Sequence, residues 1–387
     1  MASSTHVPTA AVDDELLAEA AERFGTPAYV YDLREPTRRY RALREALPAR
    51  VRICFALKAN GHPAIVSRLA AAGCGADVSS AGELAAAEHA GVAAADTVFT
   101  GPAKTPGVLA SLRRRPVGLV VVESVHEARR LARRGTEQAA LVRVNPARDV
   151  IGEGIAISAP SSRFGVDEER AAEAIAGIEA LAGISVVGIH ANRASNVLSA
   201  DAWLAGARDT VAIARGLGPL EIVDLGGGPG IAYAGEEPFD VRRFTDGLTA
   251  LAAEGFALIL ELGRWLVAEA GWYLTRVLDV KSSRGEVWVV TDGGIHHLYR
   301  PLLPEANRGL RVVHGEDRPT RRVNVAGCLS TPSDVLATAI DLSDPAPGDL
   351  IAVPRCGAYG RSHSLQPFAM HPPAAEVCFD GDDLRVM

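Results

Sequence analysis

Residues 53–60 read ICFALKAN, a short apolar run that leads directly to a lysine, Lys58. A buried lysine is costly unless its charge is neutralised or shared, so a strand ending at Lys58 indicates a special environment. Similar runs recur along the chain at 75–80, 97–102, 118–124, 139–146, 186–192, 221–228 and 257–264. Between them lie alanine-rich stretches such as AGELAAAEHAG, which contain helix formers and end in glycine.

This alternation predicts an α/β fold. Continuous apolar strands separated by helices are typical of a parallel sheet that is covered on both faces. Eight such units over about 220 residues fit a (β/α)8 TIM-like barrel. A doubly wound sheet is the alternative, because strand counting from one sequence is prone to error.

The texture of the chain changes after about residue 270, where strand-like runs joined by turns replace the helices. WYLTRVLDVKS, EVWVVTDGG, RRVNVAGC, DLIAVPRCGAYG and AEVCFDGDDLRVM are such runs, and the early strand PAYVYDL (27–33) precedes the barrel. We therefore predict a barrel over 34–270 and a second, mainly β domain, a sandwich or Greek-key-like barrel, formed by 1–33 plus 271–387. A chain of 387 residues is consistent with two domains.

Composition excludes several classes of protein. The net charge of −7, with no basic block, argues against nucleic-acid binding. No apolar stretch has the length of a membrane span, and the first residues lack the apolar core of a signal peptide. The five cysteines lack metal-type pair spacing and are interpreted as reduced thiols in a cytoplasmic protein. His296 and His297 are interpreted as loop residues with no metal set.

Polar residues stand at the predicted carboxyl ends of the strands, where barrel enzymes place their chemistry. Each has an ordinary explanation as an ion pair, a loop residue or a turn glycine, but together they indicate a site. They are Lys58, Asp77, Glu123, Arg143, His190, Asn192, Gly226, Gly227, Gly228 and Glu261.

Three features of this rim favour pyridoxal phosphate. The stretch DLGGGPG (224–230) follows a strand, and its glycines expose backbone N–H groups that can surround a phosphate. A strand-end lysine can form a Schiff base after desolvation. Glu261 could keep a pyridine nitrogen protonated, and this favours pyridoxal phosphate, while a phosphosugar aldolase with a Schiff-base lysine stays open as the alternative. Triple glycines also form ordinary turns.

The motifs resemble those of the fold type III pyridoxal phosphate decarboxylases, the group of diaminopimelate, ornithine and arginine decarboxylases. The resemblance runs from PAYVYDL to the C-terminus. It is carried by FALKAN (55–60), DVSSAGEL (77–84), SRFG (162–165), DLGGGPGI (224–231), ELGR (261–264) and CGAYG (356–360).

The resemblance implies roles for particular residues. Lys58 would form the Schiff base, Glu261 would contact the pyridine nitrogen, and Tyr359 would contact the phosphate. Asp77 and Glu83 would lie near the lysine. The further cofactor-binding residues that it implies are Arg143, Asn192, Ser195, Gly226, Gly227, Gly228, Gly263 and Arg264.

The family also implies a homodimer in which the β domain completes the shared active sites. TDGGIHHLYRP (291–301) and FAMHPPAAEV (368–377) are similar to decarboxylases of natural-product and siderophore pathways, some of which act on carrier-tethered amino acids. Arg300 is the candidate to pair with a second carboxylate on the substrate. A surface salt bridge is the alternative for Arg300.

The sequence departs from the family at two places. GIHANRASN (188–196) keeps His190 and Ser195, but Asn192 stands where a histidine usually stacks on the cofactor ring. The family's proton-donating cysteine, four residues before an aspartate, is replaced by Ser330, four residues before Asp334. A serine hydroxyl is a far weaker acid than a thiol of pKa about 8.5.

Cys328 lies two residues before Ser330, on the same face if the segment is a strand. It could therefore supply the proton, as could water, Lys58 or a histidine. Thr331 stands at a position where the family often has an acidic residue that contacts the substrate. A substrate with a basic distal amine would therefore be recognised less well here.

The sequence thus predicts a cytoplasmic decarboxylase of an amino acid, or of a modified and carrier-tethered one, that works through a Lys58 Schiff base and a quinonoid. The predicted catalytic residues are Lys58, His190, Cys328 and Ser330, and the substrate contacts are Arg300, Thr331 and Asp334. Another pyridoxal phosphate reaction on the same scaffold, such as racemisation or decarboxylation coupled to another bond change, stays open. So does a non-catalytic regulatory protein.

Overall fold

The computed structural model describes residues 12–133, 137–149, 151–158 and 161–386. Within them the chain divides into two compact units. The barrel unit comprises residues 37–231 and 237–266, and the β unit comprises 12–36, 232–236 and 267–386. The part of the second-domain prediction that covers residues 1–11 lies outside the described residues. No helix in the described ranges is long and apolar enough to cross a membrane.

Eight parallel strands form a closed ring in the barrel unit. Each strand pairs with the next in chain order, β5 pairs with β6, and β12 pairs with β2 to close the barrel. Every apolar run singled out in the sequence is one of these strands, so the predicted barrel is confirmed. The strands are β2 (Val51–Ala56), β3 (Gly75–Val78), β4 (Thr97–Phe99), β5 (Leu119–Val122), β6 (Gln138–Asn145), β9 (Ile184–His190), β11 (Ile222–Asp224) and β12 (Ala257–Leu262).

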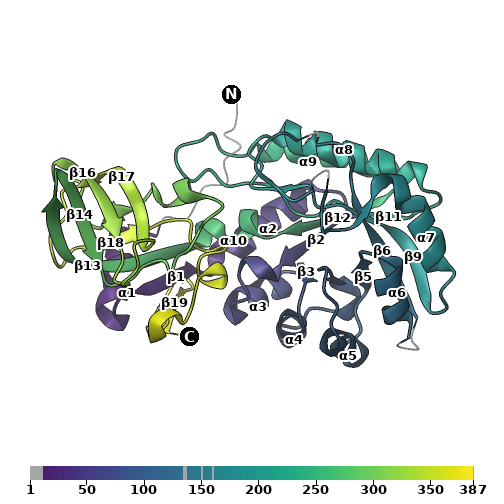
Figure 1. Ribbon diagram of the computed structural model, residues 1–387, viewed down its shortest axis with the longest axis horizontal. Coiled ribbons are helices and arrows are strands. Elements are labelled where there is room, and N and C mark those ends of the chain that lie inside the picture. Colours follow the sequence, from purple (N-terminus) through teal and green to yellow (C-terminus); the bar gives the residue numbers. More distant parts are fainter. Residues whose placement is uncertain (1–11, 134–136, 150, 159–160, 387) are drawn as a thin grey trace. The chain divides into compact units, whose positions relative to one another are not determined.

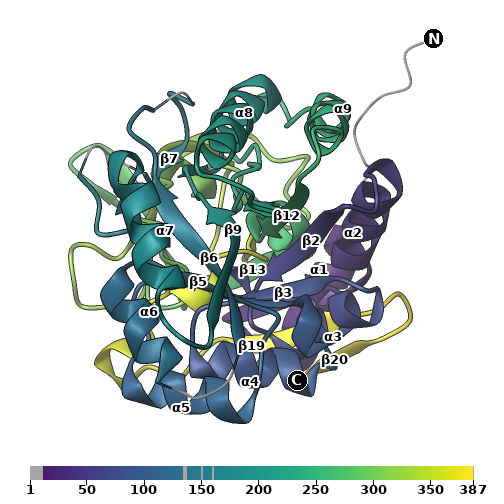
Figure 2. The same cartoon turned by 90° about the vertical axis from the view of Figure 1, so that its right-hand side faces the viewer.

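Helices surround the strands, as Figure 2 shows. Ser80, Thr105, Ser124, Ser199 and Asp240 each accept a hydrogen bond from an N–H group of the first helical turn, which starts the helix at that point. The helices are α2 (Arg34–Ala46), α3 (Pro63–Ala71), α4 (Ala81–His89), α5 (Pro106–Arg114), α6 (Val125–Ala132), α7 (Ala171–Glu179), α8 (Ala200–Gly216), α9 (Val241–Ala252) and α10 (Arg264–Val267).

Small and branched apolar side chains fill the barrel interior. One buried cluster joins Cys54, Val98, Leu119, Val121, Leu141 and Ile259 from five different strands. The packed interior leaves the carboxyl ends of the strands as the place for polar side chains.

The second unit is mostly β, as predicted. Its sheet has the order β17-β16-β14-β13-β1-β19-β20, and β18 pairs with β13 and β15. The early strand β1 lies inside this sheet, antiparallel to β13 and parallel to β19. The strands are β1 (Ala28–Asp32), β13 (Gly271–Ser283), β14 (Glu286–Thr291), β15 (Arg311–Val312), β16 (Thr320–Ala326), β17 (Val335–Ser343), β18 (Leu350–Val353), β19 (Ala375–Phe379) and β20 (Leu384–Val386).

One helix, α1 (Asp14–Phe24), packs on this sheet and was not predicted from the sequence. Its residues Leu17 and Ala20 are buried with Val30, Leu274 and Val377 of the sheet. Figure 1 labels α1 beside the strands of the β unit.

Candidate active site

Lys58 stands directly after β2, in a short 3-10 turn formed by Leu57–Ala59. Its Nζ donates a hydrogen bond of 2.7 Å to Oδ2 of Asp77, the side chain near the end of the neighbouring strand β3. Asp77 is 1% exposed, whereas 39% of the Lys58 side chain is exposed. The amine is therefore anchored on a buried carboxylate and remains accessible from outside.

The network continues through Thr100, which follows β4. Its hydroxyl oxygen lies 2.5 Å from Oδ1 of Asp77 and 2.9 Å from Oε1 of Glu261, and since the hydroxyl has a single proton it donates to one of these oxygens at a time. Burial and the negative charge of Glu261 raise the pKa of Asp77, and Lys58 acts in the opposite direction. Polar side chains at the ends of β2, β3, β4 and β12 are thus linked by hydrogen bonds.

Glu261 is the carboxylate at the centre of this network. Burial alone would raise its pKa, but the adjacent His190 and Lys58 lower it to about 2. His190, fully buried at the end of β9, has its Nε2 3.4 Å from Oε2 of Glu261. Because an ionised carboxylate only accepts hydrogen bonds, Nε2 is the protonated ring nitrogen. Glu261 is therefore a buried, ionised carboxylate.

Asp224 also belongs to the cluster, although the sequence analysis did not single it out. Its Oδ1 accepts a 2.9 Å hydrogen bond from the N–H group of Gly226. Burial and the charge of Glu261 raise the pKa of Asp224 well above its usual range, which favours the neutral form of this carboxyl. Its position at a strand end, immediately before the glycines, was the signal that could have identified it.

The triple glycine forms a tight loop after β11. Gly226 and Gly228 have positive φ angles of 65° and 120°, which favour glycine. A Cβ atom added at Gly226 would lie 2.8 Å from Cβ of Asn192, and one at Gly228 would lie 2.6 Å from Nε1 of Trp203. Only glycine fits here, and the close backbone leaves N–H groups near the carboxyl ends of the strands, as a phosphate cradle requires.

Trp203 of α8 supports this loop and was also missed. Its indole Nε1 donates a 2.9 Å hydrogen bond to the carbonyl of Gly227. The loop is thus held from outside by a buried side chain of the following helix.

The other predicted cofactor residues of the barrel lie around the same rim. Asn192 is half-buried and packs against Gly226. Ser195 lies in the short strand β10 (Ala194–Ser195), which pairs with β7 (Ile155–Ala156). Gly263 and Arg264 follow β12, buried and half-buried respectively.

Arg143, at the end of β6, is ion-paired with Glu123 at 3.0 Å and lies over the ring of Phe164 at 4.3 Å. Glu123 also accepts a 2.9 Å hydrogen bond from the N–H group of Gly165. The SRFG segment is therefore fixed onto the ends of β5 and β6.

Two charged residues have structural partners that the sequence did not indicate. Glu83 caps α4 by accepting a 2.7 Å hydrogen bond from the N–H group of Ser79, which gives a helix-capping explanation for this carboxylate. Lys104 is fully buried and lies 3.2 Å from Glu127.

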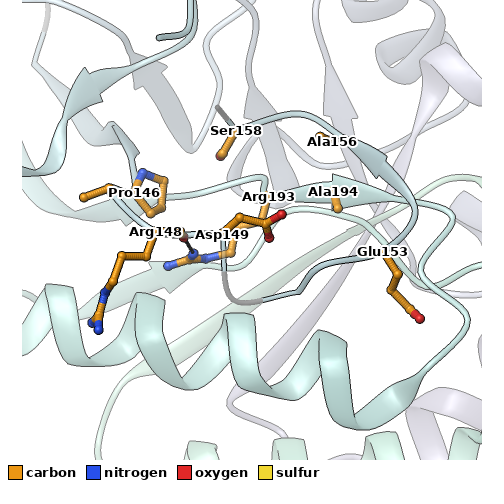
Figure 3. Close-up of a pocket in the computed structure, with 9 residues that line it drawn as sticks. Pro146, Arg148, Asp149, Glu153, Ala156, Ser158, Arg193 and Ala194 are labelled. Carbon is orange, nitrogen blue, oxygen red and sulfur yellow. Dashed lines mark hydrogen bonds between the residues drawn. The ribbon is translucent and has the colours of Figure 1, made fainter. Parts of the chain in front are cut away.

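A small polar pocket lies beside the 188–196 segment, between the ends of β6 and β9 (Figure 3). Arg193 and Arg148 both pair with Asp209 of α8, and Arg193 also donates to the carbonyl of Arg148 at 3.1 Å. Since both arginines pair with Asp209, the charged lining of this pocket is explained by contacts that hold Arg148 and Arg193 against α8.

Tyr359 and Arg300 lie in the β unit. Tyr359 is half-buried and has a φ angle of 53°, a strained conformation for an aromatic residue and one that is common at functional sites. Arg300 is 8% exposed and donates to the carbonyl oxygens of Ala306 and Arg355, at 3.1 and 2.7 Å. The alternative of a surface salt bridge for Arg300 is therefore wrong.

The 327–334 loop, between β16 and β17, carries the remaining predicted residues. Ser330 is exposed, Cys328 is half-buried, and burial together with Asp334 raises the pKa of the Cys328 thiol. Neither residue is on a strand, so the expectation that strand alternation sets them on one face does not hold. Thr331 lies in the same loop, and its hydroxyl is 2.9 Å from that of Ser333.

Asp334 is 3% exposed and occupied by main-chain donors. Its two oxygens each accept a 2.7 Å hydrogen bond, from the N–H groups of Ile295 and Leu329. These contacts favour a role in positioning loops over the predicted contact with substrate.

Comparison with known proteins identifies relatives over nearly the whole chain. Residues 33–275 match the family described as pyridoxal-dependent decarboxylase, pyridoxal binding domain. The chain is 30% identical to L-glutamyl-[BtrI acyl-carrier protein] decarboxylase of Niallia circulans, over 95% of this chain and 91% of that protein. It is 33% identical to diaminopimelate decarboxylase of Deinococcus radiodurans, over 96% and 94% of the two chains.

Solved structures agree with these relatives. The crystal structure of diaminopimelate decarboxylase from Helicobacter pylori complexed with L-lysine aligns with a TM-score of 0.86 at 30% identity, covering 96% of this chain and 95% of that one.

Proposed function

The chain belongs to the pyridoxal-dependent decarboxylases and is an amino acid decarboxylase that uses pyridoxal 5′-phosphate, and we propose that Lys58 is the residue to which the cofactor is attached. The observation that carries the proposal is the buried network from Lys58 through Asp77, Thr100 and Glu261 to His190.

The small number of lysines supports Lys58. The chain has only three, Lys58, Lys104 and Lys281. Lys104 is fully buried against Glu127, and Lys281 lies exposed on β13. Lys58 alone among these three combines a strand-end position with a partly exposed side chain and carboxylates nearby.

The neighbouring residues are suited to the cofactor. When bound, pyridoxal phosphate supplies an electron sink for the pair released as carbon dioxide leaves. Glu261, ionised and buried, can hold a proton on the pyridine nitrogen, and His190 orients this carboxylate. Because the N–H group of Gly226 is bonded to Asp224, the backbone N–H groups of Gly227 and Gly228 are the ones that can hold the phosphate, with Ser195, Gly263, Arg264 and Tyr359 as further candidates. Asn192 can lie against the ring, with less area than a histidine would give.

We further propose that the substrate is a carrier-tethered or otherwise modified amino acid. The relative from Niallia circulans acts, by its name, on glutamyl acyl-carrier protein. Two nitrogens of Arg300 donate to main-chain carbonyls and its Nε has no partner among the described residues, while Thr331 carries no charge, so neither residue would recognise a basic distal amine. A thioester-linked carrier would replace such recognition by contacts with the carrier.

Two residues are candidates for returning the proton to the α-carbon, Cys328 and Ser330. Both lie on the 327–334 loop, and the thiol is the stronger acid of the two.

By resemblance, we propose a homodimer in which the β unit completes the shared active site. Light scattering would test the dimer, and recovery of activity on mixing a Lys58→Ala subunit with a Ser330→Ala, Cys328→Ser subunit would test the sharing.

The function is tested by measuring carbon dioxide release from a panel of free amino acids and the same amino acids loaded on acyl carrier protein. The proposal predicts a higher kcat/KM for at least one loaded amino acid than for its free form. Release from free diaminopimelate or ornithine alone would overturn the carrier proposal while leaving the decarboxylase assignment intact. Racemisation without carbon dioxide release would overturn the proposed reaction.

A further inference from the structure

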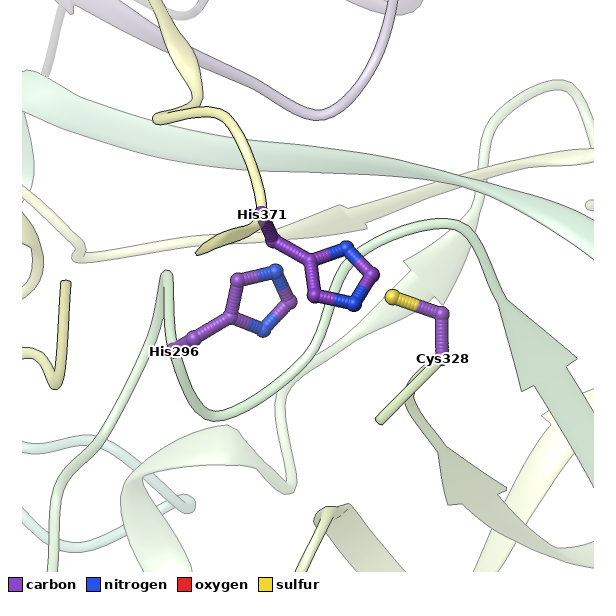
Figure 4. A group of neighbouring side chains, drawn as sticks. All are labelled: His296, Cys328 and His371. Atoms are coloured by element: carbon purple, nitrogen blue, oxygen red, sulfur yellow. The ribbon is translucent and has the colours of Figure 1, made fainter. Parts of the chain in front are cut away.

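Three potential metal ligands from distant parts of the sequence meet in the β unit. They are His296 from the loop after β14, Cys328 from the loop after β16 and His371 from the segment before β19 (Figure 4). One ring nitrogen of each histidine and Sγ of Cys328 all lie within 4.8 Å of one another. In Figure 4 the His371 ring lies between the His296 ring and the sulfur.

The observation that points to a missing ligand is the hydrogen bonding of the His296 ring. It is 1% exposed, and neither Nδ1 nor Nε2 has a hydrogen-bond partner among the described residues. A buried polar group left without a hydrogen-bond partner destabilises the fold. His371 is the neighbouring ring, with a centroid distance of 5.0 Å, so the unsatisfied imidazole faces the other candidate ligands.

Asp334 fixes two of the three loops. Its oxygens accept hydrogen bonds from the N–H groups of Ile295 and Leu329, the immediate neighbours of His296 and Cys328. A Cβ atom at Gly294 or at Gly327 would collide with the Asp334 carboxylate, so both loops need glycine to approach it. The spacing between the His296 and Cys328 backbones is thus set by a buried carboxylate.

His297 holds the third of these segments, the one that carries His371. Because a carbonyl only accepts, Nε2 of His297 donates to the carbonyl of Pro372 at 2.9 Å, next to His371. Its Nδ1 then accepts from the hydroxyl of Tyr273 at 3.4 Å. His297 is therefore a supporting residue, whereas His296 has its ring nitrogens available.

We propose that His296, Cys328 and His371 bind a zinc ion with three protein ligands and one open position. Imidazole nitrogen and thiolate sulfur are the ligands zinc prefers, and three of them with an open fourth position is the arrangement of reactive zinc sites. Zinc bonds of about 2.0–2.3 Å set ligand atoms about 3.3–3.7 Å apart, so small rotations of the side chains close the site. Binding releases the thiol proton of Cys328, and water fills the fourth position.

The proposal replaces the sequence-based expectation that no metal set accompanies His296. It also separates the two candidates for the proton donor. A zinc-bound thiolate has no proton to give, so Ser330 would be the remaining candidate on the loop.

A second group, formed by His190, Asp224 and Glu261 in the barrel, has ligand-like spacing as well. There Glu261 is already bonded to His190 and Thr100, within the network assigned to the cofactor. We therefore propose no metal site at this second group.

The test is the metal content of the untagged holoenzyme, purified without chelator and then dialysed against zinc. We expect about one zinc per chain, and at least a hundred-fold weaker binding in Cys328→Ser and in His371→Ala. The matched controls are Cys378→Ser, a buried cysteine of β19, and His89→Ala, an exposed histidine of α4. Both should keep the zinc. Content below one tenth per chain, or equal content in all four variants, which indicates an adventitious ion only, would overturn the proposal.

A second measurement uses the unmodified chain and therefore does not depend on whether the variants fold. Iodoacetamide alkylation of the peptide containing Cys328 should slow at least tenfold when zinc is added and recover with a chelator. An alkylation rate that zinc leaves unchanged would overturn the proposal. Cobalt substitution adds a spectroscopic test, since a thiolate ligand gives a charge-transfer band that Cys328→Ser should abolish.

Discussion

The barrel cluster and the β-unit cluster handle their buried polar groups in different ways. In the barrel, polar contacts link Lys58 through Thr100 and Glu261 to His190, and two buried atoms without a partner among the described residues, Nδ1 of His190 and Oδ2 of Asp224, each belong to a side chain whose other polar atom is bonded. In the β unit, His296 is as deeply buried but bonds to neither His371 nor Cys328 within the described residues. The difference teaches that the first cluster is organised by the chain itself to receive an organic cofactor. The second has rigid supports but an unsatisfied centre, as a metal site without its ion would have.

The largest expected effect is at Lys58. Lys58→Ala should lower kcat/KM by about three orders of magnitude or more, because it removes the amine to which the cofactor is attached. The zinc content of the β unit should not change. The matched control is Lys281→Ala on β13, an exposed lysine that should keep full activity. A Lys58→Ala enzyme with more than a tenth of the original kcat/KM would remove the barrel cluster from the chemistry.

Glu261→Gln comes next, with an expected loss in kcat of about a hundred-fold. The amide keeps the size of the side chain but not the charge that holds a proton on the pyridine nitrogen. Steady-state kinetics with saturating cofactor check this effect. Glu83→Gln, which alters a helix cap, is the control and should keep its activity.

The same variant has a signature in pH. Because the pKa of Glu261 is lowered from 4.5 to about 2, its ionised form stabilises the fold above pH 4.5, and this contribution is lost as pH falls towards 2. The difference in unfolding free energy between the native protein and Glu261→Gln should therefore shrink over that window. A difference that is constant from pH 5 to pH 3 would contradict the ionised state assigned to Glu261.

Asp334→Ala tests the supports of the β-unit cluster. Two buried N–H groups lose their acceptor, which should destabilise the β unit by about 2 kcal/mol and weaken zinc binding. Hydrogen exchange at Ile295 and Leu329 would report it. Asp341→Ala is the control, because Asp341 is exposed and its contact with Arg322 is 3.8 Å long. Exchange rates that are equal in the two variants would show that Asp334 does not hold these loops.

The smallest effect is expected at Asn192. Asn192→His adds ring area where the family usually has a histidine, and a stacked aromatic contact is worth about 0.5–1.5 kcal/mol. The dissociation constant of the cofactor should therefore fall several-fold, as measured by dialysis and fluorescence. Because Gly226 packs against Cβ of Asn192, which histidine retains, the loop should not move. Weaker cofactor binding in Asn192→His would contradict the position assigned to Asn192.

Sequence reasoning succeeded where periodicity and chain order decide the outcome. Eight apolar runs predicted eight barrel strands, and the polar residues after them proved to be neighbours because parallel strands end at one edge. It failed where contacts depend on three-dimensional packing. Thr100 and Asp224 looked like ordinary strand-end residues, and Glu83 turned out to have a helix-capping contact. The meeting of His296, Cys328 and His371 has no local sequence signal, because their loops are separated by 32 and 43 residues.

The most direct test of the central claim is to reduce the cofactor-loaded protein with borohydride and map the modified peptide. Since the chain has only three lysines, the result is unambiguous. Modification of Lys58, with Lys104 and Lys281 unmodified, is the predicted result. Modification of either other lysine, or a protein that takes up no cofactor, would contradict the assignment of the barrel cluster.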